Sequence, residues 1–487
     1  MFRSYRFAVA ALVATTMLVG CTVGPDFQRP TAPSATGFLS PAERTPVGGA
    51  GPIPVAGEGP QARWWTAFGS PRLDALVDQA IARNASLEAS NATLAAAREQ
   101  IAAARGRQLP QIDANARIEH EQVNLAAFGF DQPGGNPEFD LYSIGGGVSY
   151  DLDLFGGNRR RVERAVAQAE TQLRQTEAAH LTIAGQVVNQ VLLIAAIRAR
   201  IATAQALLAE DQRNVELTQK RRQAGEGTLV EVLNAQSQYQ NDRGDIPQLG
   251  QQLAEARHLL ATLTGVSPAD LGATDFDLDQ LRLPAEVPVT LPSALVHKRP
   301  DILQAEAQLH VAAANVGIAT AQLYPNITLG ATLTQGAPNL GDVLGSAFRG
   351  FDLFGGLTAP IFHGGTLKAE RRAAIDQARA ADATYRQTVL DAFRQVADLL
   401  QAIDSDTRSV SNQQEAVGVA QRSLALSRRS FQVGNSGILQ VLESERLYQR
   451  ASSALVEARA RQFLNVGRLY VATAGGWTGL ATPSSAG

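Results

Sequence analysis

Residues 222–234 read RQAGEGTLVEVLN, and residues 431–443 read FQVGNSGILQVLE. Each stretch places glycines inside a long alanine- and glutamine-rich sequence that otherwise has the composition of a helix. The two stretches share one pattern and lie 209 residues apart, counted from Gly225 to Gly434. The sequence therefore predicts the same helix-to-helix turn twice in one chain.

The repetition extends beyond these turns. ARGRQLPQIDANAR (104–117) parallels ATAQLYPNITLGAT (319–332), and LDLFGGNRRRVERA (152–165) parallels APIFHGGTLKAERR (359–372). Three landmarks in the same order predict an internal twofold repeat. Each half is expected to run helix, two strands, long helix, turn, helix.

Both halves contain a very long helical pattern. Residues 158–223 contain no proline and a single glycine, Gly185. Apolar residues recur every seven positions, with His180 as the exception: Val166, Leu173, His180, Val187, Ile194, Ile201, Leu208 and Val215. The second half keeps the row in Val389, Val396, Ile403, Val410, Val417, Leu424 and Phe431. At 1.5 Å per residue these helices are about 100 Å long, so they must pack beside other helices in a coiled coil or helical tube.

Apolar and polar residues alternate in four shorter segments. In the first, Ile112, Ala114, Ala116 and Ile118 share one face of a strand. We expect strands at about 111–126, 139–155, 325–335 and 348–362; the last is less regular because Phe354 falls among its polar residues. A soluble sheet over a core and a transmembrane barrel both fit this alternation. Four strands cannot close a barrel, so a membrane sheet would require several chains.

The remaining boundaries follow from proline, glycine and the apolar pattern. We expect an extended arm over 21–62, which holds eight prolines, an irregular linker over 266–292 and a mobile tail over 475–487. The first repeat then covers 63–265 and the second 293–474. Their further helices are expected before the first strand and at 228–263, 300–322 and 437–472, and the long helices at 158–223 and 366–432.

The N-terminus, MFRSYRFAVAALVATTMLVGC, is typical of a bacterial signal peptide over residues 1–20. Its apolar run from Phe7 to Gly20 is too short to span a membrane. The last four residues resemble a lipobox, which implies a covalent lipid on Cys21, the only cysteine. An ordinary signal peptide followed by a free thiol is the alternative. In bacterial lipoproteins an aspartate directly after the cysteine commonly marks retention in the inner membrane. This chain has Thr22 there, so the resemblance implies sorting to the outer membrane.

The sequence offers little for other kinds of chemistry. A formal charge of −3 without a basic block gives no indication of nucleic-acid binding. The six histidines lack the spacing of a metal site, and no Gly-x-Ser-x-Gly nucleophile motif occurs. We therefore predict a protein that is not an enzyme, with no catalytic residue, no metal and no cofactor other than the lipid.

Four motifs carry a family resemblance: CTVGPDFQRP (21–30), WWTAFGSPRLDALVDQAI (64–81), HKRPDILQAEAQL (297–309) and APIFHGG (359–365). Together with the paired turns they resemble the outer-membrane factors of tripartite efflux and secretion systems. These are the TolC/OprM-like proteins, and the likeness is to their NodT-type lipoprotein branch. It covers nearly all of the mature chain.

The resemblance implies an α+β membrane protein that forms a homotrimer in the outer membrane. Three chains of four strands would make a 12-stranded transmembrane β-barrel, continued by a long periplasmic α-helical barrel. Such proteins are passive exit ducts for drugs or other small molecules. An inner-membrane pump of the resistance-nodulation-division (RND) type supplies the energy, and a periplasmic adaptor connects the two.

The resemblance also implies roles for the two turns. Adaptor docking is expected at Gly225, Thr228, Leu229, Leu233, Gly434, Gly437, Ile438 and Leu442. A periplasmic gate is expected at Glu231, Asn234, Gln440 and Glu443. Glu443 keeps the acidic side chain that relatives carry there, whereas Gln440 departs from it. Two alternatives remain open: an exit duct for type I protein secretion, and a periplasmic coiled-coil scaffold or adaptor without a membrane sheet.

Overall fold

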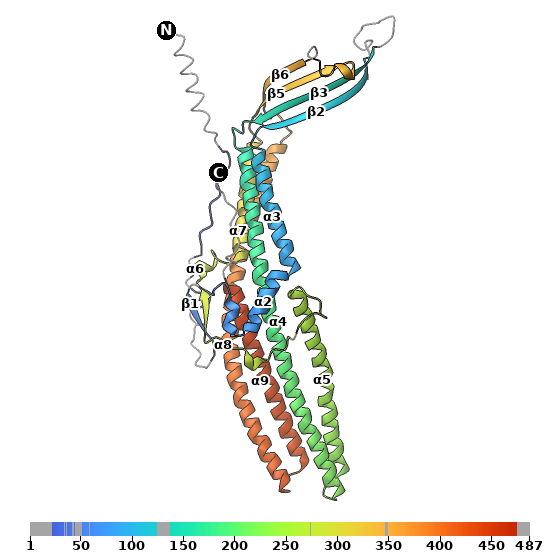
Figure 1. Ribbon diagram of the computed structural model, residues 1–487. Coiled ribbons are helices and arrows are strands. Elements are labelled where there is room, and N and C mark those ends of the chain that lie inside the picture. The colour runs from blue at the N-terminus through green and yellow to red at the C-terminus, as the bar shows by residue number, and fades with distance from the viewer. Residues whose placement is uncertain are drawn as a thin grey trace.

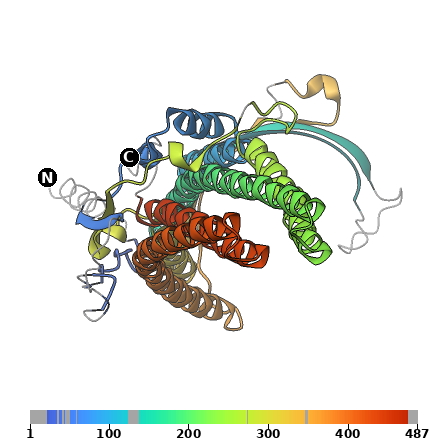
Figure 2. The same cartoon turned by 90° about the horizontal axis from the view of Figure 1, so that it is seen from below.

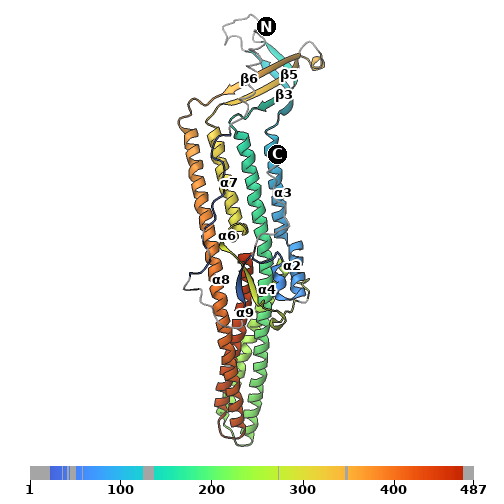
Figure 3. The same ribbon diagram turned by 90° about the vertical axis from the view of Figure 1, so that its left-hand side faces the viewer.

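The computed structural model describes residues 22–33, 35, 37–40, 43, 51–57, 59–123, 137–272, 274–345 and 349–474. These residues form an elongated molecule whose helices run along its length, with a four-stranded sheet at one end (Figures 1 and 3). The strands are β1 (Ile53–Gly57), β2 (Gln111–Gln122), β3 (Glu138–Asp151), β4 (Glu286–Thr290), β5 (Asn326–Ala337) and β6 (Arg349–Thr358). The α-helices are α2 (Pro71–Arg83), α3 (Ala85–Gly106), α4 (Gly157–Gln223), α5 (Leu229–Leu263), α6 (Pro292–Leu295), α7 (Pro300–Ala321), α8 (Thr366–Gln432) and α9 (Ile438–Thr473). Short 3-10 helices lie at η2 (Trp64–Phe68), η4 (Leu278–Gln280) and η5 (Leu340–Asp342).

The helices form a curved wall, as the view along their axes shows (Figure 2). The helices α4 and α8 have 67 residues each and run the whole length of the wall. Between them lie α7 in the half nearer the sheet and α9 in the other half, while α3 and α5 pack on the far side of α4 (Figure 3). Gly185 allows α9 to approach α4, because a Cβ at this position would come within 2.8 Å of the Val471 side chain.

The sequence predicts one helix before the first strand, whereas the structure has two helices there, α2 and α3. Asn84 separates them, since its side chain accepts hydrogen bonds from the backbone N–H groups of Ser86, at 3.0 Å, and Leu87, at 3.3 Å. An asparagine in this role begins a new helix. Its side-chain amide also donates to the carbonyl of Leu263 at 2.9 Å, which ties the break to the end of α5.

The arm and the linker each contain a strand, so the linker is not irregular throughout as the sequence predicted. β1 and β4 pair in parallel, with Val55 opposite Pro288. This small sheet lies beside the main apolar core, at the middle of the wall. There Trp64 stacks on Tyr470, with ring centroids 5.5 Å apart and planes at 14°. The core explains why two segments without helical periodicity are held in place.

The core also contains the apolar centre of α4. Of the helices that the structure describes, α4 alone has a stretch whose length and composition would let it cross a membrane. The helix contributes Ile183, Val187, Val191 and Ile194 to the buried cluster, and 39% of the apolar stretch is buried. Part of its apolar surface therefore belongs to the core.

The sheet is antiparallel throughout, in the order β2-β3-β5-β6. One row across all four strands is Ile112, Val148, Ala331 and Leu353, so the apolar positions of the four strands fall on one face. This face is uncovered: Ile112 is 81% exposed and Phe351 79%. On the other face the ring of Phe354 lies over Gly330, the residue opposite it in β5, which accounts for an aromatic residue among polar ones.

The strand ends differ from the expected ones. β2 ends at Gln122, and residues 124–126 of the expected strand are outside the described residues, as is residue 348. β3 ends at Asp151 rather than 155, because Asp153 turns the chain with a φ of +46° and its carboxylate accepts the N–H groups of Asn158 and Arg159 at the start of α4. β6 ends at Thr358 rather than 362, shortly before Pro360, which has no N–H for a sheet.

Candidate functional site: the paired helix-to-helix turns

The two turns lie together at the end of the molecule farthest from the sheet (Figures 1 and 3). They end α4 and α8 in the same way. Gly225 and Gly434 have φ values of +76° and +78°. The N–H of Glu226 donates to the Arg221 carbonyl at 2.8 Å, and the N–H of Asn435 to that of Ser430 at 2.9 Å. This is the Schellman arrangement, in which a left-handed glycine closes the helix end.

The helices that follow the turns begin differently. Thr228 caps α5: its hydroxyl accepts the N–H of Glu231 at 3.3 Å, while the Glu231 carboxylate accepts the N–H of Thr228 at 2.8 Å. This reciprocal pair is a capping box. Gly437, at the equivalent place before α9, has no side chain to cap with. The Glu231 carboxylate, expected at a gate, is thus engaged in holding the start of its own helix.

The expected apolar docking residues are exposed in the first turn, whereas in the second turn Ile438 is buried and Leu442 is partly buried. Leu229 is 49% exposed and Leu233 52%. In contrast Ile438 is 1% exposed and packs with Leu424, Phe431 and Val441, and Leu442 packs against the same cluster. Ile438 therefore supports the shape of the second turn from inside and does not present its side chain to a partner.

The other expected gate residues are exposed. Asn234, Gln440 and Glu443 all lie on the surface of this single chain. Glu443 pairs with Arg446 on its own helix at 2.8 Å. The hydrogen bonds and ion pairs found over the described residues do not join any of the four expected gate residues to another of the four.

The helices that flank the turns form two pairs, α4 with α5 and α8 with α9. The contacts between these pairs involve residues that the sequence analysis did not predict. The Arg428 guanidinium of α8 lies 2.7 Å from Glu210 of α4 and 2.9 Å from Glu445 of α9. Asn214 of α4 donates a further hydrogen bond to Glu445. Glu445 is 3% exposed, and burial raises its pKa although Arg428 opposes the shift. We call Glu210, Asp211, Asn214, Arg428 and Glu445 the inter-pair cluster.

Asp211 is the most buried member of this cluster, with 1% of its surface exposed. Its carboxyl meets that of Asp242 from α5, with Glu445 and Glu210 nearby. Burial and then the Asp242 carboxylate raise the pKa of Asp211 to about 8. The sequence indicates the burial of Asp211. A second seven-residue row lies three residues after the heptad row and includes Ile183 and Ile197, and Asp211 falls in this second row.

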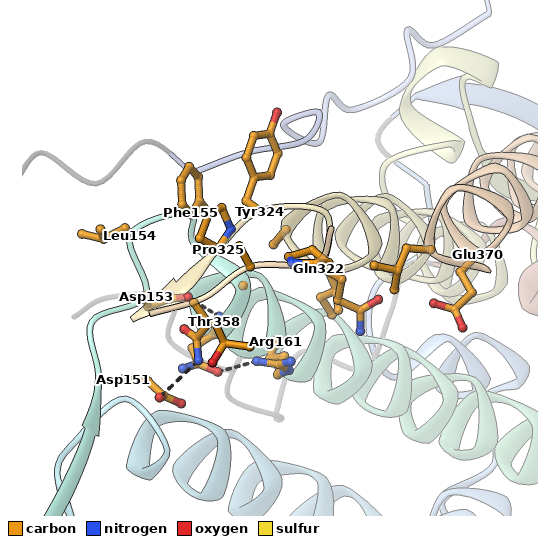
Figure 4. A pocket seen from close by; sticks show the side chains of 18 of the residues that line it. Asp151, Asp153, Leu154, Phe155, Arg161, Gln322, Tyr324, Pro325, Thr358 and Glu370 are labelled. Atoms are coloured by element: carbon orange, nitrogen blue, oxygen red, sulfur yellow. Dashed lines mark hydrogen bonds between the residues drawn. The ribbon is translucent and has the colours of Figure 1, made fainter. Parts of the chain in front are cut away.

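The opposite end of the wall has a cavity of about 450 Å³ beneath the sheet. Asp151, Asp153, Arg161, Tyr324 and Glu370 are among the side chains that line it (Figure 4). They come from the end of β3, the β3–α4 and α7–β5 connections and the starts of α4 and α8. Within the described ranges no group of three or more His, Cys, Asp or Glu side chains could hold a metal ion. Cys21, the expected lipidation site, lies outside the described residues.

Comparison with known proteins agrees with this architecture. The sequence model of the outer membrane efflux protein family matches residues 76–266 and 291–475. The chain is 34% identical over 418 residues to the pyoverdine export outer membrane protein OpmQ of Pseudomonas aeruginosa, which covers 85% of this chain and 87% of OpmQ. It is 29% identical over 469 residues to the probable efflux pump outer membrane protein TtgC of Pseudomonas putida, covering 96% and 94%.

Solved structures give the same result. The outer-membrane channel OprN superposes with a TM-score of 0.84 at 26% identity, covering 94% of this chain and all of that one. The open state of the MtrE outer membrane channel of Neisseria gonorrhoeae gives 0.80 at 27% identity, covering 94% and 99%. The resemblance seen in the motifs is thereby confirmed. The chain belongs to the outer membrane efflux protein family, and it is an outer-membrane exit channel with a periplasmic extension.

Proposed function

We propose that three copies of the chain form one channel, with a shared 12-stranded barrel and a helical tube below it. The uncovered apolar face of the sheet, from Ile112 on β2 to Leu353 on β6, carries this proposal. β2 and β6 are the edge strands of the sheet. In lipid each of their unpaired backbone N–H and C=O groups would cost on the order of several kcal/mol, because no water is there to bind it. Pairing β6 of one copy with β2 of the next removes every edge.

The helices support the same assembly. The curved wall of one chain is suited to be a third of a tube, with α8 of one copy beside α3 and α5 of the next. The two halves of the chain have helices of matching length, 22 residues for α3 and α7 and 67 for α4 and α8, which supports the internal twofold repeat.

We propose that the channel passively exports drugs or other small molecules that an RND-type inner-membrane pump and a periplasmic adaptor deliver. The relatives support small molecules as the cargo, because they are named for pyoverdine export, toluene efflux and cation efflux.

The adaptor would meet the turns at their exposed positions, Gly225, Thr228, Leu229, Leu233, Gly434 and Gly437. The gate would be formed where the six turns of a trimer converge, with Asn234, Gln440 and Glu443 as the exposed polar side chains. A lipid on Cys21 would add a second anchor.

The assembly is tested with protein extracted from membranes. We expect a trimer whose electrophoretic migration changes on heating, and stepwise single-channel conductance in a planar bilayer. A soluble monomer without conductance would contradict the channel. Efflux of small molecules in cells that express a matched pump and adaptor tests the cargo, and secretion of a polypeptide in their place would identify a type I secretion duct.

A further inference from the structure

The polar face of the four-stranded sheet carries an excess of negative charge. Beside the apolar row lies the row of Asp113, Gly147, Thr332 and Asp352, one on each strand. Successive residues of a strand point to opposite faces, so this row belongs to the polar face. The charged residues of this face over the four strands are Asp113, Arg117, Glu119, Glu121, Asp151 and Asp352. Five carboxylates against one guanidinium give a net charge of −4 in one copy.

Little of this charge is compensated within the sheet. The guanidinium of the polar face, that of Arg117, pairs with Glu119 of its own strand at 2.8 Å. Asp113, Glu121 and Asp352 are exposed, and no ion pair among the described residues involves them. These three carboxylates are therefore the main source of a negative field on this face.

The negative charge reaches the lower end of the sheet. Asp151, at the end of β3, accepts hydrogen bonds from Thr328 at 2.8 Å and from Asn326 at 3.4 Å, and these neutral donors leave its charge in place. Asp151 also lines the cavity of about 450 Å³ beneath the sheet, together with Glu370 and Arg161 (Figure 4). Asp151 therefore brings the charge of the sheet down to the point at which the sheet joins the helices.

The two turns at the opposite end of the molecule have no such excess. Residues 220–231 and residues 428–446 each contain three basic and two acidic side chains. They are Lys220, Arg221, Arg222, Glu226 and Glu231 around the first turn, and Arg428, Arg429, Glu443, Glu445 and Arg446 around the second. Glu231 holds the start of α5, and Glu443 pairs with Arg446. The turns thus offer no net negative charge at the periplasmic opening.

The proposed barrel places the polar face of the sheet around the lumen. The apolar face must meet lipid, so the polar face lines the interior. Three copies would bring fifteen carboxylates and three guanidinium groups to one lumen, a net charge of −12. A barrel of 12 strands is wider than one of about eight strands, whose interior is filled by side chains, so water and ions have room to pass.

Charges on the wall of such a lumen act on ions throughout it at low salt. The screening length is about 10 Å at 0.1 M ionic strength and about 30 Å at 0.01 M, so the fields from opposite walls overlap in dilute solution. The low dielectric constant of the wall concentrates these fields, which raises the local concentration of cations and lowers that of anions. Carboxylates that line a pore favour cations in ion channels by the same effect.

We propose that the pore through the membrane sheet selects cations over anions, and that Asp113, Glu121 and Asp352 are the residues that set this selectivity. The inference rests on the proposed barrel. The carboxylates act through their field and do not bind the cargo at a fixed place, so the selectivity weakens as salt is added. Positively charged small molecules would pass more readily than anions of the same size.

Reversal potentials in planar bilayers test this selectivity on the purified full-length trimer. With KCl at about 0.01 M on one side and about 0.03 M on the other, we expect K⁺ to permeate about five times as readily as Cl⁻ or more. The ratio should approach one at about 1 M KCl, where the screening length is about 3 Å. Asp113→Asn, Glu121→Gln and Asp352→Asn together should lower the ratio at least threefold in dilute KCl. These changes keep the size of exposed side chains, so the trimer and its conductance steps should persist.

Two further variants locate the effect. Asp113→Glu with Asp352→Glu keeps both charges in place and should retain the wild-type ratio. Glu231→Gln with Glu443→Gln removes two carboxylates from the turns and should lower the ratio less than the sheet variant does. Each single neutral substitution in the sheet should lower the ratio by a smaller amount, so the single variants decide the question even if the triple variant fails to assemble.

Three results would overturn the inference while conductance steps still support the channel. They are a wild-type ratio near one in dilute KCl, an unchanged ratio in the sheet variants, and a larger fall in the turn variant than in the sheet variant. Absence of conductance steps in the wild-type protein would contradict the channel itself, and the inference with it.

Discussion

The guanidinium of Arg221, in the last turn of α4, lies 4.5 Å from the centre of the Phe431 ring, in the last turn of α8. A cation and the face of an aromatic ring attract each other. The interaction free energy is about 0.5–1 kcal/mol at an exposed site and larger where water is excluded. The two residues belong to different halves of the chain and precede the two glycine turns. The turns are therefore held as one unit at the end of the molecule.

Replacement of either turn glycine should block export without removing the channel from the membrane. Gly225→Val or Gly434→Val forces a β-branched residue into a left-handed conformation, at a cost of roughly 1–3 kcal/mol. Open space surrounds both positions, so the effect is on the backbone. We expect efflux to fall at least tenfold in a cell-based accumulation assay while heat-modifiable trimers persist.

Gly244→Val is the control for this experiment, because Gly244 lies inside α5 with equal open space and an ordinary helical conformation. It should retain efflux. Loss of the trimer in the Gly225 or Gly434 variants would instead assign the glycines to folding.

Thr228→Ala and Glu231→Gln should separate helix capping from a gating charge. Loss of the Thr228 hydroxyl removes the cap of α5 and should cost about 1 kcal/mol. Faster hydrogen exchange over residues 229–233 would report it. Glu231→Gln keeps an oxygen for the N–H of Thr228 but removes the charge. If conductance and ion selectivity stay at wild-type values in Glu231→Gln, its role is the cap; a change in selectivity would assign the carboxylate to the pore.

Arg428→Ala should loosen the contact between the two helix pairs. It removes the cation between Glu210 and Glu445 and leaves the Glu445 carboxylate buried without its charge partner. Since Arg428 is partly exposed, we expect a loss of roughly 1–3 kcal/mol rather than the larger cost of a fully buried pair. Spin labels at positions 226 and 435 would report a broader distance distribution between the turns. Arg429→Ala, at an exposed neighbour, should leave that distribution unchanged.

Asp211→Asn should remove a pH dependence of stability. The folded pKa of about 8 lies above the ordinary value of 3.8, so the folded chain binds more protons than the unfolded chain between these limits. The free energy of unfolding should therefore fall as pH rises from about 4 to 8, by on the order of a few kcal/mol. Asp242, Glu445 and Glu210 face this carboxyl as anions, and Arg428 is the cation nearby.

Thermal unfolding of the purified protein between pH 5 and 9 measures this effect. Asp211→Asn should be more stable than wild type at pH 8–9 and should show a flatter pH profile. Asp245→Asn, at an exposed carboxylate three residues after Asp242, is the control and should follow the wild-type profile. A wild-type profile in Asp211→Asn would show that this carboxyl titrates in its ordinary range.

Regular patterns in the sequence predict much of the fold. The heptad row and the absence of proline predict a helix over 158–223, and the structure has α4 over Gly157–Gln223. Alternation predicts four strands whose apolar positions share a face, as the register of Ile112, Val148 and Leu353 shows. The paired glycines predict two turns of one kind, and Gly225 and Gly434 have nearly the same φ.

Other features depend on residues far apart in the chain and have no local pattern. The pairing of β1 with β4 joins segments more than 200 residues apart, from Ile53 to Glu286, and depends on the Trp64 core beside them. The inter-pair cluster brings Asp211, Arg428 and Glu445 together from three helices. The seven-residue row indicates only that Asp211 faces other helices. It does not identify the partners, because Arg428 and Glu445 each look like an ordinary polar residue of a helix.

The sequence by itself determined the long helices, the strands and the two turns, because helix and strand periods and the left-handed freedom of glycine are local properties. Tertiary structure decided which side chains of the turns are exposed and which support the fold. It buried Ile438 and left Leu229 exposed, and it used the Glu231 carboxylate as a cap. It also bound the arm to Arg160 and His310. Burial and ion pairing depend on which helices lie side by side, and only the folded chain fixes that.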